Sequence, residues 1–380
     1  MPDARNGAMQ KAEHEMVVCN ACRYCEAYCP VFQAMEQRVA FTPGDLTYLA
    51  NLCHNCGECL YACQYAPPHE FNIDVPRTLS MLRVESYETA AWPSFAGIAF
   101  RRPWAATSLA LVVSIVLVIF SSPVTRPFSG AARPFSGAAR TFQVRDANFY
   151  SVIPHHVMVI IFGVVGLFTV AAIAIGHRRF TRLADPKGPR PSGDGSRYGG
   201  SVPHGRAVRD ALSLKHLHAT GEDCVDGEEQ RRPWRRWLHH CTFYGFALCF
   251  ASTTVAAFYH LVFGWIAPYA YTSVPVVLGT AGGVGLLVGP AGLLALDRRR
   301  DPALTDASER SLGGAFLAML LLTSVTGLVL LVLRERPYMP TLLVIHLVVV
   351  LAFFITVPYG KFVHGIYRSA ALLKFRRECV

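Results

Sequence analysis

Six long apolar runs fill most of the chain beyond residue 100, and polar stretches separate them. The runs cover residues 105–122, 152–176, 241–265, 274–296, 312–333 and 340–360. A helix of about 18 or more apolar residues is long enough to cross a bilayer. The pattern therefore predicts a six-span transmembrane helical bundle at 101–380, inserted in a lipid bilayer, with a polar linker at 177–240.

The first hundred residues form a separate, more polar part of the chain. Leu79, Leu82 and Val84 follow helical spacing and predict a helix over 76–87. A second helix is expected within 35–52, with Asp45 as its N-cap. No charged start is followed by an apolar core in this part, so we expect no signal peptide.

Charge is distributed unevenly along the chain. Residues 1–100 hold 6 Lys/Arg and 11 Asp/Glu, so the net charge of +10 comes entirely from the remainder. If the N-terminus is cytoplasmic, the loops and flanks of 101–380 on that side hold 24 Lys/Arg and those on the other side 6. The positive-inside rule then predicts an inner-membrane protein with both termini and residues 1–100 in the cytoplasm. Because topology explains the basic excess, we expect no nucleic-acid partner.

Eight of the 12 cysteines stand in two runs of identical spacing, C-x2-C-x2-C-x3-C. Runs of this spacing hold [4Fe–4S] clusters, and in two-cluster ferredoxins the fourth cysteine of each run binds the other cluster. The sequence therefore predicts two [4Fe–4S] clusters in a ferredoxin-like domain at 1–100. The expected ligands are Cys19, Cys22, Cys25 and Cys63 for cluster 1, and Cys53, Cys56, Cys59 and Cys29 for cluster 2.

A pair of zinc sites is the alternative interpretation of these thiols. Zinc sites usually space their four ligands as two separated pairs, which four closely spaced cysteines fit poorly. The second run departs from the usual ferredoxin form, because Gln64 stands where a proline follows the first run. The helical pattern between the runs favours the α-helical ferredoxin type of succinate dehydrogenase and heterodisulfide reductase subunits. The predicted fold class is thus mainly α.

Histidines in the apolar spans indicate a further redox group, since polar rings inside a bilayer are costly. His346 and His364 are 18 residues apart, so an unbroken helix would place both rings on one face, about 27 Å apart along its axis. Two haems stacked across a bilayer need that arrangement. This span, with FF…P…VH between the histidines, resembles the last span of the dihaem cytochrome b subunit of respiratory nitrate reductase. We therefore expect one or two haem b groups.

Each haem iron then needs a second axial histidine, and the third span offers three. His239 or His240 lies at its inner end and His260 at its outer end. On a regular helix His239 is about 60° from His260 around the axis, whereas His240 is about 160° away. The expected pairs are His239, or else His240, with His364, and His260 with His346. Histidines that merely reach the lipid headgroups are the alternative.

His155 and His156 stand near the outer end of the second span. They are candidates for alternative haem ligands or for a quinone site, and an interfacial position explains them equally well. The chain has no dinucleotide-binding fingerprint in a strand–turn–helix context, and no nucleophile–base constellation is apparent. We therefore expect no catalytic residues, and an electron-transfer subunit rather than a stand-alone enzyme.

The stretches ACRYCEAYCPVF, CQYAPPHEF and HHCTFYGFALCFASTTVAAFYH, with the six spans, resemble the citrate- and tricarballylate-utilisation protein B family (CitB/TcuB). The resemblance covers nearly the whole chain. It implies a protein that reoxidises the reduced FAD of a soluble partner, a tricarballylate dehydrogenase-like enzyme, and passes electrons to the membrane quinone. The alternatives are a quinol-oxidising reductase subunit that moves electrons inward, and a redox-sensing membrane protein or transporter.

Overall fold

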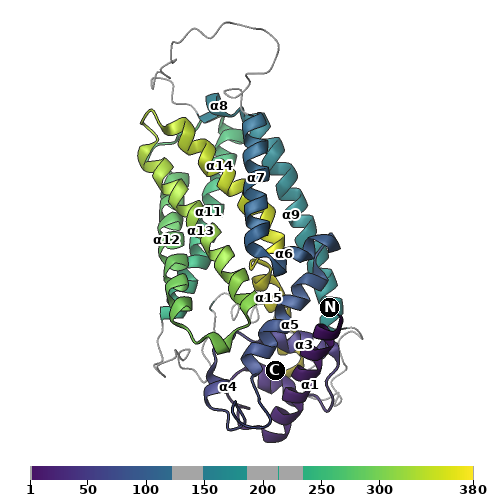
Figure 1. Cartoon of the computed structure of the whole chain (residues 1–380). Helices are drawn as coiled ribbons and strands as arrows, with labels where there is room; N and C mark the ends of the chain where they lie inside the picture. Colours follow the sequence, from purple (N-terminus) through teal and green to yellow (C-terminus); the bar gives the residue numbers. More distant parts are fainter. Residues whose placement is uncertain (1, 122–148, 186–212, 214–233, 380) are drawn as a thin grey trace.

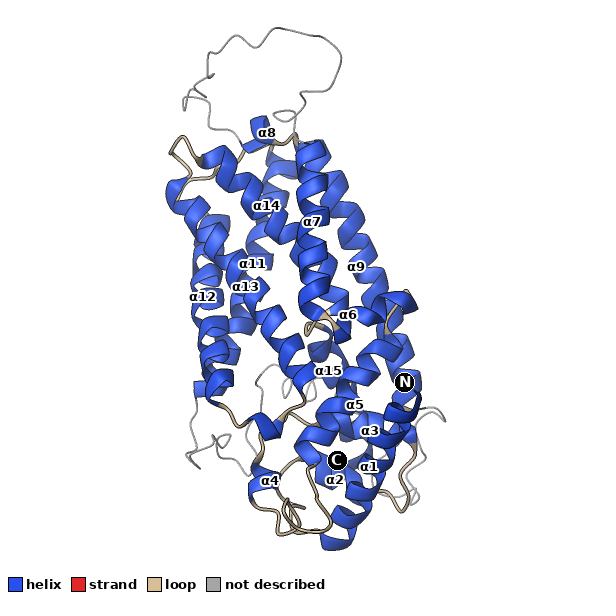
Figure 2. Cartoon of the chain, in the orientation of Figure 1, coloured by secondary structure: helices blue, strands red, loops and turns tan. Residues whose placement is uncertain are grey.

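The computed structural model describes residues 2–121, 149–185, 213 and 234–379. Within these residues every regular element is helical, and no strand is present (Figure 2). Long helices lie side by side in a bundle, and short helices gather at one end of it, where both chain termini also lie (Figure 1). The predicted mainly α fold is therefore confirmed. The predicted linker at 177–240 falls largely outside the described residues.

Five helices build the cysteine-rich end of the molecule. They are α1 (Pro2–Cys22), α2 (Pro30–Glu36), α3 (Pro43–Leu52), α4 (Glu58–Tyr61) and α5 (Val75–Ala90). Prolines stand in the first turn of α2, α3 and α5, where their fixed φ suits a helix start and the missing N–H costs nothing. The predicted helix over 76–87 corresponds to α5 and is confirmed.

The start of α3 differs from the expectation that Asp45 is its N-cap. Thr42 is the cap, and its hydroxyl accepts a hydrogen bond from the Asp45 amide at 3.2 Å. The Asp45 carboxylate in turn accepts from the Thr42 amide at 3.1 Å, which completes a capping box. Two hydrogen bonds between Thr42 and Asp45 thus stabilise the start of α3, the helix that ends just before Cys53.

The cysteine-rich helices share one apolar core with two helices from later in the chain, α9 (His155–Ala184) and α15 (Val363–Cys379). The ring of Phe180 in α9 stacks on Tyr367 in α15 with centroids 4.5 Å apart, and Tyr367 contacts Tyr87 of α5 at 5.5 Å. These contacts dock the cysteine-rich end on the bundle. The boundary at residue 100 between two domains stays a prediction, since this core includes residues from both sides.

Six helical segments in the described part are long and apolar enough to cross a membrane. They are α7 (Pro103–Ser121), α9, α11 (Trp234–Phe263), α12 (Val274–Arg299), α13 (Ala307–Leu333) and the segment from α14 (Met339–Thr356) through α15. Short elements lie between the long helices. They are η1 (Ser94–Gly97) and α6 (Ile98–Arg101) between α5 and α7, α8 (Phe149–Val152) before α9, and η5 (Pro302–Leu304) between α12 and α13. The predicted number of spans is confirmed.

The last span is not the unbroken helix assumed for His346 and His364. Helix α14 ends at Thr356, the 3₁₀ turn η6 (Val357–Tyr359) follows, and α15 begins only at Val363. Pro358 lacks an N–H and its ring obstructs a continuing helix. The prediction of an unbroken helix from His346 to His364 is therefore wrong.

Helices α11 and α12 approach each other closely because of glycines. A Cβ at Gly282 would lie 2.7 Å from the backbone nitrogen of Cys249, and one at Gly289 would lie 2.6 Å from that of Thr242. Only glycine leaves room for this contact. The glycines of α12 thus pack a helix pair, as their position in the middle of a span predicts.

Candidate functional site

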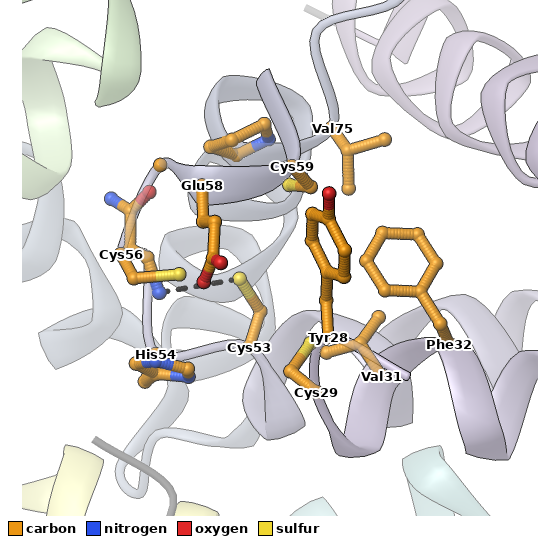
Figure 3. Close-up of a pocket in the computed structure, with 13 residues that line it drawn as sticks. Tyr28, Cys29, Val31, Phe32, Cys53, His54, Cys56, Glu58, Cys59 and Val75 are labelled. Atoms are coloured by element: carbon orange, nitrogen blue, oxygen red, sulfur yellow. Dashed lines mark hydrogen bonds between the residues drawn. The ribbon is translucent and has the colours of Figure 1, made fainter. Parts of the chain in front are cut away.

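The eight cysteines of the two runs form two groups of four, each with three residues from one run and one from the other. One cavity is lined by Cys19, Cys22, Cys25 and Cys63, which we call site A. A second cavity is lined by Cys29, Cys53, Cys56 and Cys59, which we call site B (Figure 3). Each cavity thus contains the four cysteines that the spacing assigns to one cluster, and Cys59 also borders the cavity of site A. The ligand assignment itself stays a prediction.

Sites A and B adjoin each other. Phe32, Cys59 and Val75 line both cavities, so the two sites share a wall. They differ in depth: the four cysteines of site A are all partly exposed, whereas Cys53 and Cys56 of site B are buried. Site A is therefore the one nearer to the water.

Site A is formed where α1 ends. Cys19 and Cys22 occupy the last turn of this helix, and the chain then turns sharply at Arg23, whose φ is 56°. The Arg23 amide donates to the Cys19 carbonyl at 2.8 Å and closes that turn. The turn leads to Cys25, and Cys63 arrives at the same cavity from the segment after α4.

Site B is formed by helix ends and a tight loop. Cys29 caps the start of α2 and Cys53 the end of α3. Between Cys53 and α4 the chain passes through two left-handed conformations, at Asn55 with φ 59° and at Gly57 with φ 91°. The backbone N–H of Asn55 donates to the Cys53 sulfur at 3.3 Å (Figure 3).

Three of these thiols, those of Cys25, Cys29 and Cys59, resist deprotonation on their own. Burial first, and then neighbouring thiols, raise the pKa of Cys25 to about 12 and hold the pKa values of Cys29 and Cys59 well above the usual value. Four thiolates at one site therefore need a cationic partner, and soft thiolates select iron–sulfur clusters, zinc or copper(I).

The spacing of the donors separates these partners. Among the described residues, no three His, Cys, Asp or Glu side chains are arranged to hold a single metal ion. Four zinc ligands each lie about 2.3 Å from one ion, whereas a multi-iron cluster takes each thiolate on a different iron. The C-x2-C-x2-C-x3-C spacing of the cysteines along the chain fits an iron–sulfur cluster better than the two separated ligand pairs of a zinc site.

Site B is linked to the membrane bundle through α15. Arg368 donates to the carbonyl of Leu52, the residue before Cys53, at 3.0 Å. One turn earlier in α15, Nδ1 of His364 lies 3.1 Å from the Tyr87 hydroxyl. A histidine considered for haem ligation therefore stands one helical turn from a residue that contacts the backbone of site B.

His239 and His240 belong to the same end of the bundle. His239 lies close enough to His364 and Arg368 to interact with both electrostatically. His240 stacks instead on Tyr244, with ring centroids 5.6 Å apart. The Nδ1 atoms of both histidines are buried and have no hydrogen-bond partner among the described residues. The surroundings therefore favour His239 as the neighbour of His364.

At the far end of the bundle the nearest partner of His260 differs from the expected one. The ring of His155 lies against His260 with centroids 3.8 Å apart, and Tyr150 contacts it at 5.0 Å. No ring contact joins His260 to His346 within the described helices. His156 is exposed. The residue that contacts His260 is thus His155, which the sequence indicated as a candidate for an alternative haem ligand or a quinone site.

His346 belongs to α14, and its ring lies against α13. Its Nδ1 is 3.0 Å from the Thr326 hydroxyl, and its ring covers Gly327, where a Cβ would lie 2.9 Å from Cε1 of the histidine. Only a glycine at this position leaves the ring in place.

Three of these histidines share a pattern that fits iron ligation. Nδ1 of His260 is 3.2 Å from the Trp265 carbonyl, Nδ1 of His346 meets Thr326 and Nδ1 of His364 meets Tyr87. No hydrogen bond to their Nε2 atoms is present in the described part of the chain. Ligating histidines are usually oriented in this way, with one nitrogen held by the protein and the other directed to the metal. These side chains therefore fit the axial positions of a haem.

The sequence did not point to the charged residues beneath site B. Arg83, 1% exposed, donates to Glu309 at 2.6 Å, and Lys361 forms an ion pair with the same carboxylate. Glu309 lies in the first turn of α13 and Lys361 just before α15. The charges of Glu309 and Lys361 at the ends of apolar spans were the available signal, since Arg83 and Glu309 are 226 residues apart in the chain.

Comparisons with known proteins agree with this architecture. Residues 12–89 match the family model described as citrate utilization protein B Fer4-like domain, and residues 136–379 match the model for citrate utilization protein B. The chain is 45% identical to the citrate utilization protein B of Escherichia coli over 375 residues, which is 97% of this chain and 92% of that protein. No solved structure matches it. The N-terminal part is thus a Fer4-like domain with the clustered cysteines of an iron–sulfur protein, and the chain belongs to the citrate utilization protein B family.

Proposed function

We propose that this protein is a membrane-anchored electron carrier between a soluble dehydrogenase and a quinone. It takes electrons from the reduced FAD of a partner of the citrate- or tricarballylate-utilising type. The electrons pass through two [4Fe–4S] clusters and haem b. The name of the Escherichia coli relative supports the metabolic setting, and the Fer4-like domain supports the electron-transfer role.

The observation that carries this proposal is the contact between the cysteine domain and the histidine-bearing helix. Arg368 contacts the backbone beside Cys53 while His364, four residues earlier, contacts Tyr87 of the cysteine domain. A route from site A through site B to His364 therefore needs no moving part. Redox groups held in fixed, adjacent positions are what electron transfer across a domain boundary requires.

We assign the cluster ligands as the two groups of four cysteines. Site A (Cys19, Cys22, Cys25 and Cys63) would hold cluster 1, and site B (Cys29, Cys53, Cys56 and Cys59) cluster 2. When bound, the clusters supply one-electron chemistry, and the chain orients them and limits their contact with water.

For the haem groups we assign His364 with His239 at the end near site B. At the far end we assign His260, with His155 or His346 opposite it. Alanine variants at His155 and His346 distinguish the two possibilities, because only the true ligand removes the same haem signal as His260→Ala. If both variants leave that signal unchanged, the far haem assignment is wrong.

The membrane placement in this proposal has both termini and the cysteine domain in the cytoplasm, in the inner membrane. The charge distribution supports it, since the loops at the cysteine-domain end carry most of the Lys and Arg. A quinone is soluble in the bilayer and so reaches the spans directly. His156, exposed at the other end, remains a candidate for the quinone site together with His155.

The test of the cofactor content uses the purified full-length protein. Iron and acid-labile sulfide are quantified, and a dithionite-reduced minus oxidised absorption spectrum is recorded. We expect two clusters per chain and the reduced bands of haem b. A transporter or a simple redox sensor would show no haem, and that spectrum would reject the relay.

A further inference from the structure

Four arginines from four different elements donate hydrogen bonds to the backbone of the loop that carries Cys53. Arg83 of α5 donates to the carbonyls of Ala50 at 2.9 Å and of Cys53 itself at 2.7 Å. Arg368 of α15 donates to the Leu52 carbonyl at 3.0 Å. Two guanidinium groups from opposite ends of the sequence thus hold the end of α3.

The other two arginines donate to the same carbonyl group, that of Asn55, two residues after Cys53. Arg235, in the first turn of α11, donates to the Asn55 carbonyl at 3.4 Å. Arg300, at the C-cap of α12, donates to the same oxygen. The loop that carries Cys53 and Cys56 therefore lies among four positive charges, three of which belong to the ends of candidate membrane spans.

Two of these charges act on the thiols of site B as well as on the backbone. Arg368 is close enough to Cys53 and Cys29 to interact with both electrostatically, and Arg83 interacts with Cys53 in the same way. Arg83 is 1% exposed, so water screens its charge little. An amide hydrogen bond from Asn55 to the Cys53 sulfur adds to this effect.

Site A has acidic neighbours instead. Glu15, also 1% exposed, interacts electrostatically with Cys19 and Cys63. Glu58 interacts with Cys25 of site A and also lines the cavity of site B, so its charge acts on both sites (Figure 3). The difference between the sites therefore lies in the arginines of site B.

Reduction of an iron–sulfur cluster adds one negative charge, so nearby positive charge stabilises the reduced form and raises the reduction potential. Nearby negative charge has the opposite effect. We propose that Arg83, Arg235, Arg300 and Arg368 hold site B at a higher reduction potential than site A. Site B is then the site from which electrons leave for the membrane, and site A, which is less buried, is the one that the partner's flavin reduces.

This inference rests on the proposed relay, because it assigns an order to the relay's two clusters. One electron leaves site A, which is oxidised, and arrives at site B, which is reduced, and no proton moves. The electron comes from the reduced flavin of the partner and goes on to oxidised haem. The four arginines are positioning residues: they touch neither substrate nor reacting atoms.

Glu309 provides a variant of opposite sign in the same network. Its carboxylate pairs with Arg83 and with Lys361 and so offsets part of their positive charge. Removal of the arginine charge in Arg83→Gln should lower the potential of site B. Removal of the carboxylate charge in Glu309→Gln should raise it. A purely structural role would move both variants in the same direction.

The experiment is a redox titration of the purified full-length protein, followed by electron paramagnetic resonance. The variants are Arg83→Gln, Arg368→Gln, Glu309→Gln and the charge-conserving Arg83→Lys. Arg101→Gln is the matched control, since Arg101 pairs with Glu88 away from both sites. Cys22→Ser, which changes one ligand of site A, identifies the signal of that site. Iron content and haem absorbance show that each variant has folded.

In the wild-type protein we expect site B to be reduced at a higher potential than site A. Arg83→Gln and Arg368→Gln should lower the reduction potential of site B and leave that of site A nearly unchanged. Glu309→Gln should raise the potential of site B. Arg83→Lys, which keeps the charge, should have a site B potential close to that of the wild type. Site A at the higher potential, or shifts of one sign in all variants, would overturn the inference and leave the relay standing. If Arg83→Gln loses its clusters, Arg368→Gln, Glu309→Gln and the wild-type order decide the question. A protein without clusters would instead overturn the proposed function itself.

Discussion

The hydroxyl of Tyr87 lies 3.1 Å from Nδ1 of His364, and this contact joins the cysteine-rich part of the protein to its last membrane span. Tyr87 is completely buried, and its ring packs on Phe100 and Tyr367. The core therefore fixes the tyrosine, and the tyrosine fixes the histidine ring. Such support of a ligating histidine typically changes metal affinity about 10- to 100-fold.

If His364 binds haem as proposed, Tyr87→Phe should weaken that binding. We expect a haem content reduced in that proportion when the protein is titrated with haem, with the iron–sulfur signals unchanged. Tyr367→Phe is the matched control, because Tyr367 is equally buried in the same core and its hydroxyl lies beside Gly176 rather than a histidine. Equal haem binding in both variants would show that Tyr87 does not orient a ligand.

Crossed ligation of the clusters predicts that a cysteine substitution damages the cluster of the opposite run. Cys29→Ala should remove or convert the cluster at site B and leave that of site A, although Cys29 belongs to the first run. Cys63→Ala should do the reverse. Electron paramagnetic resonance and iron quantification distinguish the signals. Loss of both signals in equal measure, or loss of the signal from the substituted residue's own run, argues for uncrossed sites.

Gly327→Ala should displace His346. The added Cβ would lie 2.9 Å from Cε1 of the imidazole, closer than carbon atoms approach, so the ring must move. If His346 binds haem iron, this variant should lose or shift one haem signal in the absorption spectrum. Gly313→Ala, in the same helix with nothing within 4 Å of its added Cβ, should leave the spectrum unchanged. An unaltered spectrum in Gly327→Ala would favour His155 as the partner of His260.

The stability of the cysteine-rich part should depend on pH through Glu15. Burial raises the pKa of this carboxyl group from 4.5 to about 7, against the lowering effects of the Asp74 amide, Lys11 and Thr78. A raised pKa means that folding favours the protonated acid. Its contribution is full below about pH 4.5 and is lost as the pH rises through 7. The shift corresponds to at most about 3 kcal/mol.

Glu15→Gln removes this dependence, since an amide does not titrate. Thermal denaturation of the full protein, followed by cluster absorbance at pH 5.5 and pH 8, should show a larger loss of stability at pH 8 for the wild type than for the variant. The groups facing Glu15 are Lys11, Asp74, Cys19 and Cys63. If wild type and variant lose stability equally between the two pH values, one of those groups carries the effect.

Local patterns predicted most of the elements, because each depends on residues near one another in the sequence. The six spans follow from runs of apolar residues, and α5 from the helical spacing of Leu79, Leu82 and Val84. The cysteine spacing also predicted which thiols share a cavity, although ligation itself stays a prediction. The pair formed by Arg83 and Glu309 could not be predicted in this way, because 226 residues separate the partners.

The break before α15 shows how one strong signal can obscure a weaker one. The run from His346 to Ile355 is so apolar that a single helix through His364 appeared sufficient. Pro358 and Gly360 already indicated an interruption, and the structure places the end of α14 at Thr356. After this interruption α15 packs in the core of the cysteine-rich part, where His364 contacts Tyr87.

The central claim is that electrons travel from a partner's flavin to haem in this chain. Membranes containing the protein should be mixed anaerobically with a flavin-dependent dehydrogenase from the same source, reduced by its organic acid substrate, and flavin and haem absorbance followed together. The account predicts that the flavin is reoxidised as the haem is reduced, that Cys53→Ala prevents both, and that added quinone reoxidises the haem. Haem reduction by the organic acid without the dehydrogenase, or a flavin that stays reduced in the presence of intact clusters and haem, would contradict it.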